Sequence, residues 1–174
     1  MTIIPPLEDH QVQEKGWEEV LRRCREVRTP DELFVRILAR APGYAKAIHD
    51  AMYLSHVEGN VDHKLKEIIR IQLARRAGDT YFAQLRSEKA KKEGLTEGLI
   101  EAGCADFRND PRFTPAEKWA LSYAWLMYRE PQKLDQRFYD EGKKYWTEAQ
   151  IMELGAMIAL HYGMAVFMRT LRAP

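Results

Sequence analysis

Apolar residues recur along most of the chain at spacings of three and four, which is typical of amphipathic α-helices. The pattern predicts helices at residues 10–27, 31–40, 43–57, 62–77, 80–93, 96–103, 115–129, 135–144 and 148–171. No segment alternates apolar and polar residues with period two between turn signals, so no β-strand is expected. The sequence therefore predicts an all-α fold.

Three helix starts are marked by the capping-box pattern, a hydroxyl residue followed three positions later by a carboxylate or an amide. They are Thr29 to Glu32, Thr114 to Glu117 and Thr147 to Gln150, and the first two also carry proline at the first helical position. Gly78 marks the end of the 62–77 helix, and Asp79 is a natural N-cap for the next helix.

Two predicted helices are apolar on more than one side. In 62–77, Leu65 and Ile69 fall on one face while Ile71 and Ala74 fall on nearly the opposite one. The 148–171 segment is apolar almost all round and rich in small residues and methionine. These patterns predict burial in a helical bundle, an oligomer interface, or both.

Composition narrows the class of protein. The 174 residues carry 27 Lys+Arg and 26 Asp+Glu, a net charge of +1 that gives no reason to expect nucleic acid or an anionic membrane as partner. Cys24 and Cys104 lie far apart, so neither a disulfide framework nor a zinc site is indicated. With no signal-peptide pattern and no uninterrupted apolar run of bilayer length, we expect a soluble, cytoplasmic protein. The length favours one domain over 1–174, with 1–29 as a helical extension.

The 62–77 helix carries the first candidate for chemistry. Glu67 shares a face with Ile71 and Ala74, where an ionised carboxylate is costly without a cation or several donors. Arg70, three residues on, and Arg86, beyond the turn at Gly78, are the candidate cations. Glu67 is thus either a proton acceptor or substrate anchor, or one half of a structural salt bridge. His63, one turn earlier, is either its acid–base partner or a surface residue.

Other polar residues also have two possible roles. Arg86 lies two helical turns after Asp79 and could clamp a carboxylate, or it could be an ordinary solvated arginine. His161 lies in the apolar C-terminal helix, where a core histidine with a hydrogen-bond partner is the default. His56 ends a helix, where it could simply favour the negative end of the dipole. No spacing of histidines and carboxylates fits a transition metal, and no glycine-rich phosphate loop is present.

Several stretches together resemble the carboxymuconolactone decarboxylase-like and alkylhydroperoxidase D-like superfamily over about residues 30–174. They are VDHKLKEIIRIQLARRAG, KKEGLTEGLIEAG, NDPRFTPAEKWALSYAWLM and WTEAQIMELGAMIAL. The resemblance implies a helical bundle of about eight or nine helices and a pocket beside the first turn of the 80–93 helix. It also implies a homo-trimer or homo-hexamer.

The chain departs from this family at its redox residues. The family's Cys-x-x-Cys, and the histidine four residues after it, are replaced by Asp79, Phe82 and Arg86, while its relay glutamate is matched by Glu67. Thiol peroxidase chemistry is therefore excluded at this site. Arg86 stays protonated near neutral pH and cannot replace the histidine as a general base. The chain is interpreted as a divergent member that lacks the motif.

Two functions remain open. The first is a non-redox enzyme of decarboxylase, lyase or isomerase type that acts on a small organic acid without metal or cofactor. The second is a non-catalytic oligomeric binding protein that retains the fold. For the enzyme, the predicted catalytic residues are Glu67, His63 and Tyr81, and the predicted substrate-binding residues are Arg86, Asp79, Phe82, His161 and Tyr162.

Overall fold

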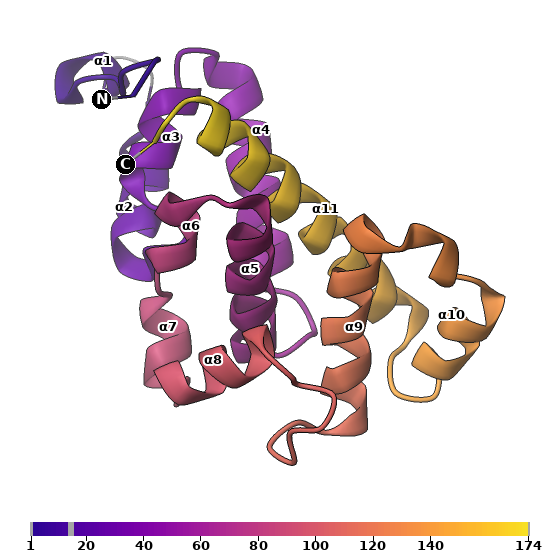
Figure 1. The fold of residues 1–174 in the computed structure, drawn as a ribbon. Coiled ribbons are helices and arrows are strands. Elements are labelled where there is room, and N and C mark those ends of the chain that lie inside the picture. Colours follow the sequence, from indigo (N-terminus) through magenta and orange to yellow (C-terminus); the bar gives the residue numbers. More distant parts are fainter. Residues whose placement is uncertain (1, 14–15, 174) are drawn as a thin grey trace.

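The computed structural model describes residues 2–13 and 16–173, and over these residues it is helical, with no strand. Figure 1 shows how the helices are arranged. The elements are α1 (Asp9–Gln13), α2 (Glu18–Val27), α3 (Glu32–Leu38), α4 (Pro42–His56), α5 (His63–Ala77), α6 (Thr80–Gln84), α7 (Glu88–Lys92), α8 (Glu97–Cys104), α9 (Pro115–Arg129), the 3₁₀-helix η1 (Pro131–Lys133), α10 (Gln136–Gly142) and α11 (Glu148–Thr170). The predicted all-α fold is confirmed.

Helix α5 is the centre of the molecule. Nearly all of its residues are buried, including the polar Lys66, Glu67 and Arg70. It packs along α11 and also contacts α4, α6, α8 and α9. Asp62 caps its start by accepting a hydrogen bond from the Leu65 amide, and Gly78 ends it in the left-handed conformation. The apolar residues predicted on opposite faces are therefore covered from both sides.

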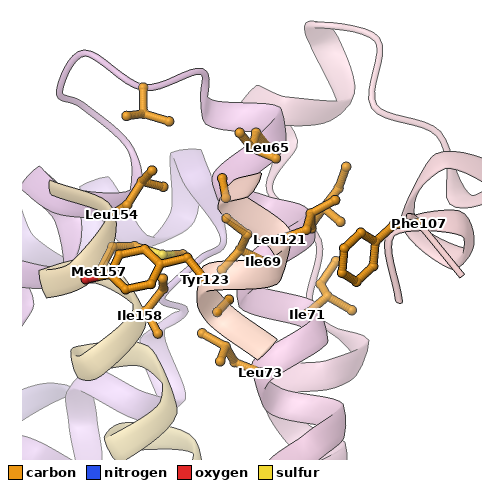
Figure 2. Close-up of a cluster of buried hydrophobic side chains, with 14 of the residues drawn as sticks. Leu65, Ile69, Ile71, Leu73, Phe107, Leu121, Tyr123, Leu154, Met157 and Ile158 are labelled. Atoms are coloured by element: carbon orange, nitrogen blue, oxygen red, sulfur yellow. The ribbon is translucent and has the colours of Figure 1, made fainter. Parts of the chain in front are cut away.

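Two clusters of buried apolar side chains meet at α5 and α11. The first joins α5, α8 and α9 to the first half of α11, with Leu65, Ile69 and Leu154 among its members (Figure 2). The second joins the N-terminal residues, α2, α3, α4 and α6 to the second half of α11. The polar side chains in the middle of α5 are buried as well, so they are shielded from solvent.

Three predicted helix boundaries differ from the structure. The 10–27 segment forms two helices, α1 and α2, and residues 14–15 between them lie outside the described residues. The 80–93 segment is broken between α6 and α7, with Leu85 in an extended conformation. The first capping box is wrong, because Asp31 rather than Thr29 caps α3 through the Phe34 amide. The capping boxes at Thr114 and Thr147 are confirmed.

Helix α11 is long and apolar enough, by length and composition, to cross a membrane. In the fold it packs against α5 and α4, as a core helix does. Its charged residues bond inside the protein: Glu153 accepts from Lys66 Nζ at 2.7 Å, and Arg169 donates to the Ala77 carbonyl at 2.9 Å. Its outer side exposes Met152, which is 71% accessible.

Candidate functional site

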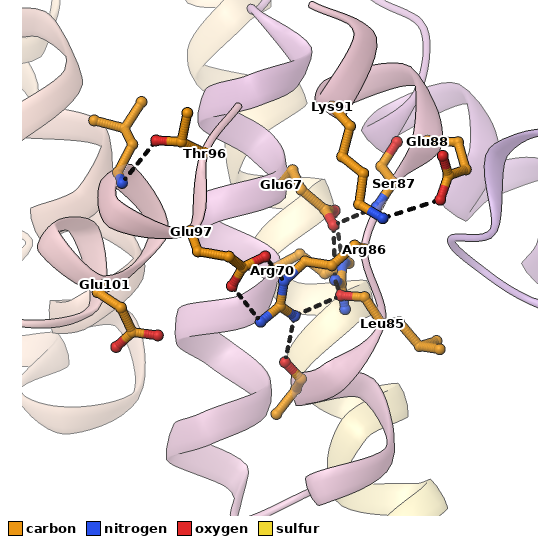
Figure 3. A network of polar contacts seen from close by, with 12 residues as sticks. Glu67, Arg70, Leu85, Arg86, Ser87, Glu88, Lys91, Thr96, Glu97 and Glu101 are labelled. Carbon is orange, nitrogen blue, oxygen red and sulfur yellow. Dashed lines mark hydrogen bonds and ion pairs between the residues drawn. The ribbon is translucent and has the colours of Figure 1, made fainter. Parts of the chain in front are cut away.

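The predicted site centres on Glu67, whose side chain is fully buried in the middle of α5. Arg70 grips the carboxylate with two hydrogen bonds, from Nε to Oε2 at 2.7 Å and from Nη2 to Oε1 at 2.8 Å. The Ser87 amide donates to Oε1 at 2.8 Å (Figure 3). His56 Nε2 lies 3.0 Å from Oε2. Each carboxylate oxygen therefore has two nitrogen neighbours.

These contacts decide the charge of Glu67. Burial alone would raise its pKa, but the charge and hydrogen bonds of Arg70, with the neighbouring His56, outweigh burial and hold the pKa well below its usual value. A carboxylate with a depressed pKa and no free oxygen is a poor proton acceptor. The geometry fits the structural salt bridge better than the catalytic base.

The break between α6 and α7 belongs to the same network. Arg70 donates to the carbonyl oxygens of Phe82 at 2.6 Å and Leu85 at 2.7 Å, which the interrupted helix leaves without partners. Ser87 then caps α7 by accepting from the Ala90 amide, while its own amide points to Glu67. Arg70 thus donates hydrogen bonds both to the Glu67 carboxylate and to two carbonyl oxygens beside the helix break.

Three histidines surround the Glu67–Arg70 pair. His63 does not bond to Glu67 as predicted; its ring nitrogens contact the His56 carbonyl at 2.8 Å and Ser87 Oγ at 2.7 Å. The His56 ring lies 4.8 Å from that of His63 and 4.9 Å from that of His161. Neither nitrogen of His56 makes a hydrogen bond of regular geometry, and His161 Nε2 has no partner among the described residues.

The histidines are neutral near pH 7. Burial lowers the pKa of His56 to about 4, and it lowers that of His161 well below the ordinary value. Burial also lowers the pKa of His63. At the expected active site, the fold therefore places three neutral imidazole rings beside an ionised carboxylate. Both oxygens of this carboxylate already have nitrogen neighbours.

The other predicted residues are used inside the fold. Tyr81 donates its hydroxyl hydrogen to Asp31 and accepts from the Phe34 amide at 3.1 Å, so it caps α3 rather than facing a ligand. Asp79 is the N-cap of α6, as expected. The remaining two make ring contacts: Phe82 packs edge-on against Phe34, and Tyr162 stacks on Tyr128.

Arg86, one of the two candidate cations for Glu67, does not pair with it. Its guanidinium binds Glu97 in a bidentate fork, at 2.7 and 3.0 Å, and donates to the Ala83 and Leu85 carbonyls (Figure 3). Arg70, one turn from Glu67, supplies the cation instead. Arg86 nevertheless lines a pocket of about 190 Å³, together with Arg28, Gln84, Leu85, Glu88 and Lys91.

His56 and Ser87 belong to the site but were not predicted as such. A signal for His56 exists in the sequence, because it continues a buried stripe on α4 at helical spacing, formed by Ala45, His49 and Met52. Ser87 carried no sequence signal, since its role depends on the break in the 80–93 helix. Within the described residues, no group of three histidine, cysteine or acidic side chains could hold a metal ion.

The two cysteines lie outside this network and are poor nucleophiles. Burial raises the pKa of Cys24 to about 12, and burial also raises the pKa of Cys104. We expect the double variant Cys24→Ser/Cys104→Ser to consume peroxide no more slowly than the unaltered protein in a dithiothreitol-coupled assay. Peroxide consumption that disappears in the double variant would contradict this.

The arrangement of helices is that of known proteins. Neither a family model nor a curated protein matches the sequence. Among solved structures, a cysteine-to-alanine variant of the debrominase Bmp8 in complex with 2,3,4-tribromopyrrole superposes with a TM-score of 0.81 at 20% identity, over 100% of this chain and 91% of that chain. A peroxidase-related protein from Silicibacter sp. TM1040 superposes with a TM-score of 0.77 at 11% identity, over 98% of this chain and 91% of that chain. An alkylhydroperoxidase AhpD core protein from Ralstonia eutropha JMP134 superposes with a TM-score of 0.70 at 15% identity, over 97% of this chain and 86% of that chain.

The chain therefore has the alkylhydroperoxidase D-like fold shared by carboxymuconolactone decarboxylase-like proteins, as the sequence resemblance implied. One protein of this fold is an enzyme, the debrominase Bmp8, so the fold can be catalytic.

Proposed function

We propose that this protein binds a small organic acid in the pocket between α2 and the α6–α7 break, and that it releases the acid unchanged. The observation that carries the proposal is the lining of this pocket of about 190 Å³, in which Arg86 pairs with Glu97 and Lys91 pairs with Glu88, while Arg28 is left over. The Arg28 guanidinium makes no hydrogen bond or ion pair with any residue that the structure describes. A free guanidinium fork matches a carboxylate.

The size and place of the pocket fit a small ligand. It is smaller than the cavities that hold drug-sized molecules, which start at roughly 300 Å³. It lies at the end of α6 and the start of α7, about one turn beyond the first turn of the 80–93 segment, where the family resemblance implies the active site. Leu85 joins the pocket to the interior, because the Leu85 carbonyl accepts from both Arg86 and Arg70. The buried Glu67–Arg70 pair does not line the pocket, but Arg70 holds the Leu85 carbonyl beside it.

Binding without turnover is favoured because the expected catalytic groups are occupied. Both oxygens of Glu67 accept hydrogen bonds from Arg70, and the Tyr81 hydroxyl donates to Asp31. Both ring nitrogens of His63 contact protein groups. None of the three is free to take a proton from an acid held by Arg28.

The second candidate is the non-redox decarboxylase, lyase or isomerase. One observation favours it: His56 lies 3.0 Å from the Glu67 carboxylate and its Nδ1 has no partner among the described residues, so Glu67 could orient an imidazole base. In this reading His56, and not His63, moves the proton.

A titration with carboxylates of two to six carbons at constant ionic strength tests the proposal. We expect one of them to bind saturably by calorimetry, and Arg28→Gln to weaken its Kd at least tenfold, since a charged hydrogen bond contributes about 1.5–3 kcal/mol. Arg28 is the better probe because Arg86 also holds the α6–α7 break. The matched control is Arg112→Gln, at an exposed arginine paired with Asp110, which should leave the Kd unchanged.

The same samples separate the two candidates. Proton NMR of the bound acid should show the same spectrum after a day. Conversion of the acid that is lost in His56→Phe would establish the enzyme instead. Absence of saturable binding, or binding that Arg28→Gln leaves unchanged, would overturn the proposed site.

A further inference from the structure

Three arginines converge on one indole ring at a distance from the organic-acid pocket. The guanidinium carbons of Arg76, Arg108 and Arg129 lie 4.9, 5.4 and 5.4 Å from the centre of Trp125. They come from α5, from the connection between α8 and α9, and from the end of α9. Arg108 also lies 4.9 Å from the Phe107 ring.

This arginine cluster has no counter-charge. None of its three guanidiniums makes a hydrogen bond or ion pair with another described residue. Neighbouring arginines behave differently, because Arg75 pairs with Glu101 and Arg112 pairs with Asp110. Like charges held together without an acid repel one another, and the cost is greatest where water is partly excluded.

Arg76 is the arginine of the cluster from which water is most clearly excluded. Its Nε is buried and has no partner among the residues that the structure describes. Burial, with the charges of Arg129 and Arg108, lowers its pKa to about 10. A ligand cannot reach the covered Nε, so a bound acceptor would meet the two Nη groups of Arg76, which make no hydrogen bond with the described residues and are not buried.

We propose that the cluster of Arg76, Arg108 and Arg129 around Trp125 is a binding site for a small molecule that bears a phosphate group. Contact with the indole face uses the guanidinium charge but not its N–H groups, which stay free for phosphate oxygens. Three positive charges match the charge of about −1.5 to −2 on a phosphate monoester better than that of a single carboxylate. A nucleic acid fits less well, because the whole chain carries a net charge of only +1.

The site is separate from the organic-acid pocket. In Figure 1, α5 lies between α7 and α9, and the organic-acid pocket lies beside α7, whereas Arg129 belongs to α9. The Arg28→Gln variant should therefore leave phosphate binding unchanged, so this inference can fail or stand independently of the proposed function.

Tryptophan fluorescence with pyrophosphate as the probe tests the site directly. We expect a saturable change in emission that is absent in Trp125→Phe, and a melting temperature that rises with pyrophosphate but not with sodium chloride at equal ionic strength. Arg108→Gln, at an exposed position, should weaken the Kd at least tenfold. Arg112→Gln, in the same connection but paired with Asp110, is the control and should not.

Two results would overturn the inference. One is a pyrophosphate effect no larger than that of sodium chloride at matched ionic strength. The other is a fall in molar mass by light scattering when Arg108→Gln is combined with Arg129→Gln, because the arginines would then face acidic groups of a second copy of the chain.

Discussion

Replacing Arg70 by methionine is expected to lower the free energy of unfolding by about 3–5 kcal/mol, the usual cost of removing one partner of a buried ion pair. The variant leaves the Glu67 carboxylate in a dry interior with the Ser87 amide and His56 as its remaining neighbours. It also removes the arginine donor to the Phe82 carbonyl, and an unsatisfied buried acceptor adds to the cost, whereas the Leu85 carbonyl keeps Arg86 as a donor. Urea denaturation at pH 7 measures the change.

A double-mutant cycle makes this test specific. Glu67→Gln/Arg70→Met should be less destabilised than the sum of the two single variants, because the double variant contains no unpaired buried charge. The matched control is Arg75→Met on the same helix, whose pair with Glu101 is exposed and should contribute less than about 1 kcal/mol. Additive single and double variants, or an Arg70 effect as small as that of Arg75, would show that the pair does not hold the fold together.

Much of the fold could be predicted because its signals are local. The start of α5 at Asp62, its end at Gly78 and the cap at Asp79 depend on residues within one helical turn. The capping boxes at Thr114 and Thr147 are local in the same way. The break at Leu85 could not be predicted, because the donor that satisfies the freed carbonyls is Arg70, fifteen positions earlier in the chain.

The candidate site, too, could be predicted only as far as its signals are local in the sequence. Sequence spacing identified Glu67 as a carboxylate that needs a cation, and it gave Arg70 and Arg86 as candidates. Choosing between them required the path of the chain after α6, which turns Arg86 outward to Glu97. His56 was assigned to a helix end, although its place on the buried stripe of α4 indicates an interior residue. Periodicity could have indicated that His56 is buried, but it could not have shown that Glu67 is its neighbour.

The buried histidines should make the protein sensitive to mild acid. In the unfolded chain His56 binds a proton near pH 6.5, whereas in the folded protein its pKa is about 4. Between these values the unfolded state binds more protons, so the free energy of unfolding falls as the pH is lowered. At about 1.4 kcal/mol per pH unit for one group, His56 alone should cost about 2 kcal/mol between pH 7 and pH 5. His161, whose pKa is also lowered by burial, should add to this loss.

Urea denaturation at pH 7 and pH 5 measures this loss, and single substitutions assign it to the histidines. Around His56 the facing charged and titratable groups are Glu67, His63, Arg70 and His161. Glu67 stays ionised throughout this range, because its pKa lies well below the ordinary value, so its contribution is lost only at lower pH. His56→Gln should therefore reduce the loss by about 2 kcal/mol. His10→Gln, at an exposed position, should leave it unchanged. Equal stability of the unaltered protein at both pH values would mean that the histidines take up protons in the folded protein as readily as in the unfolded chain, and the neutral centre described for α5 would then be wrong.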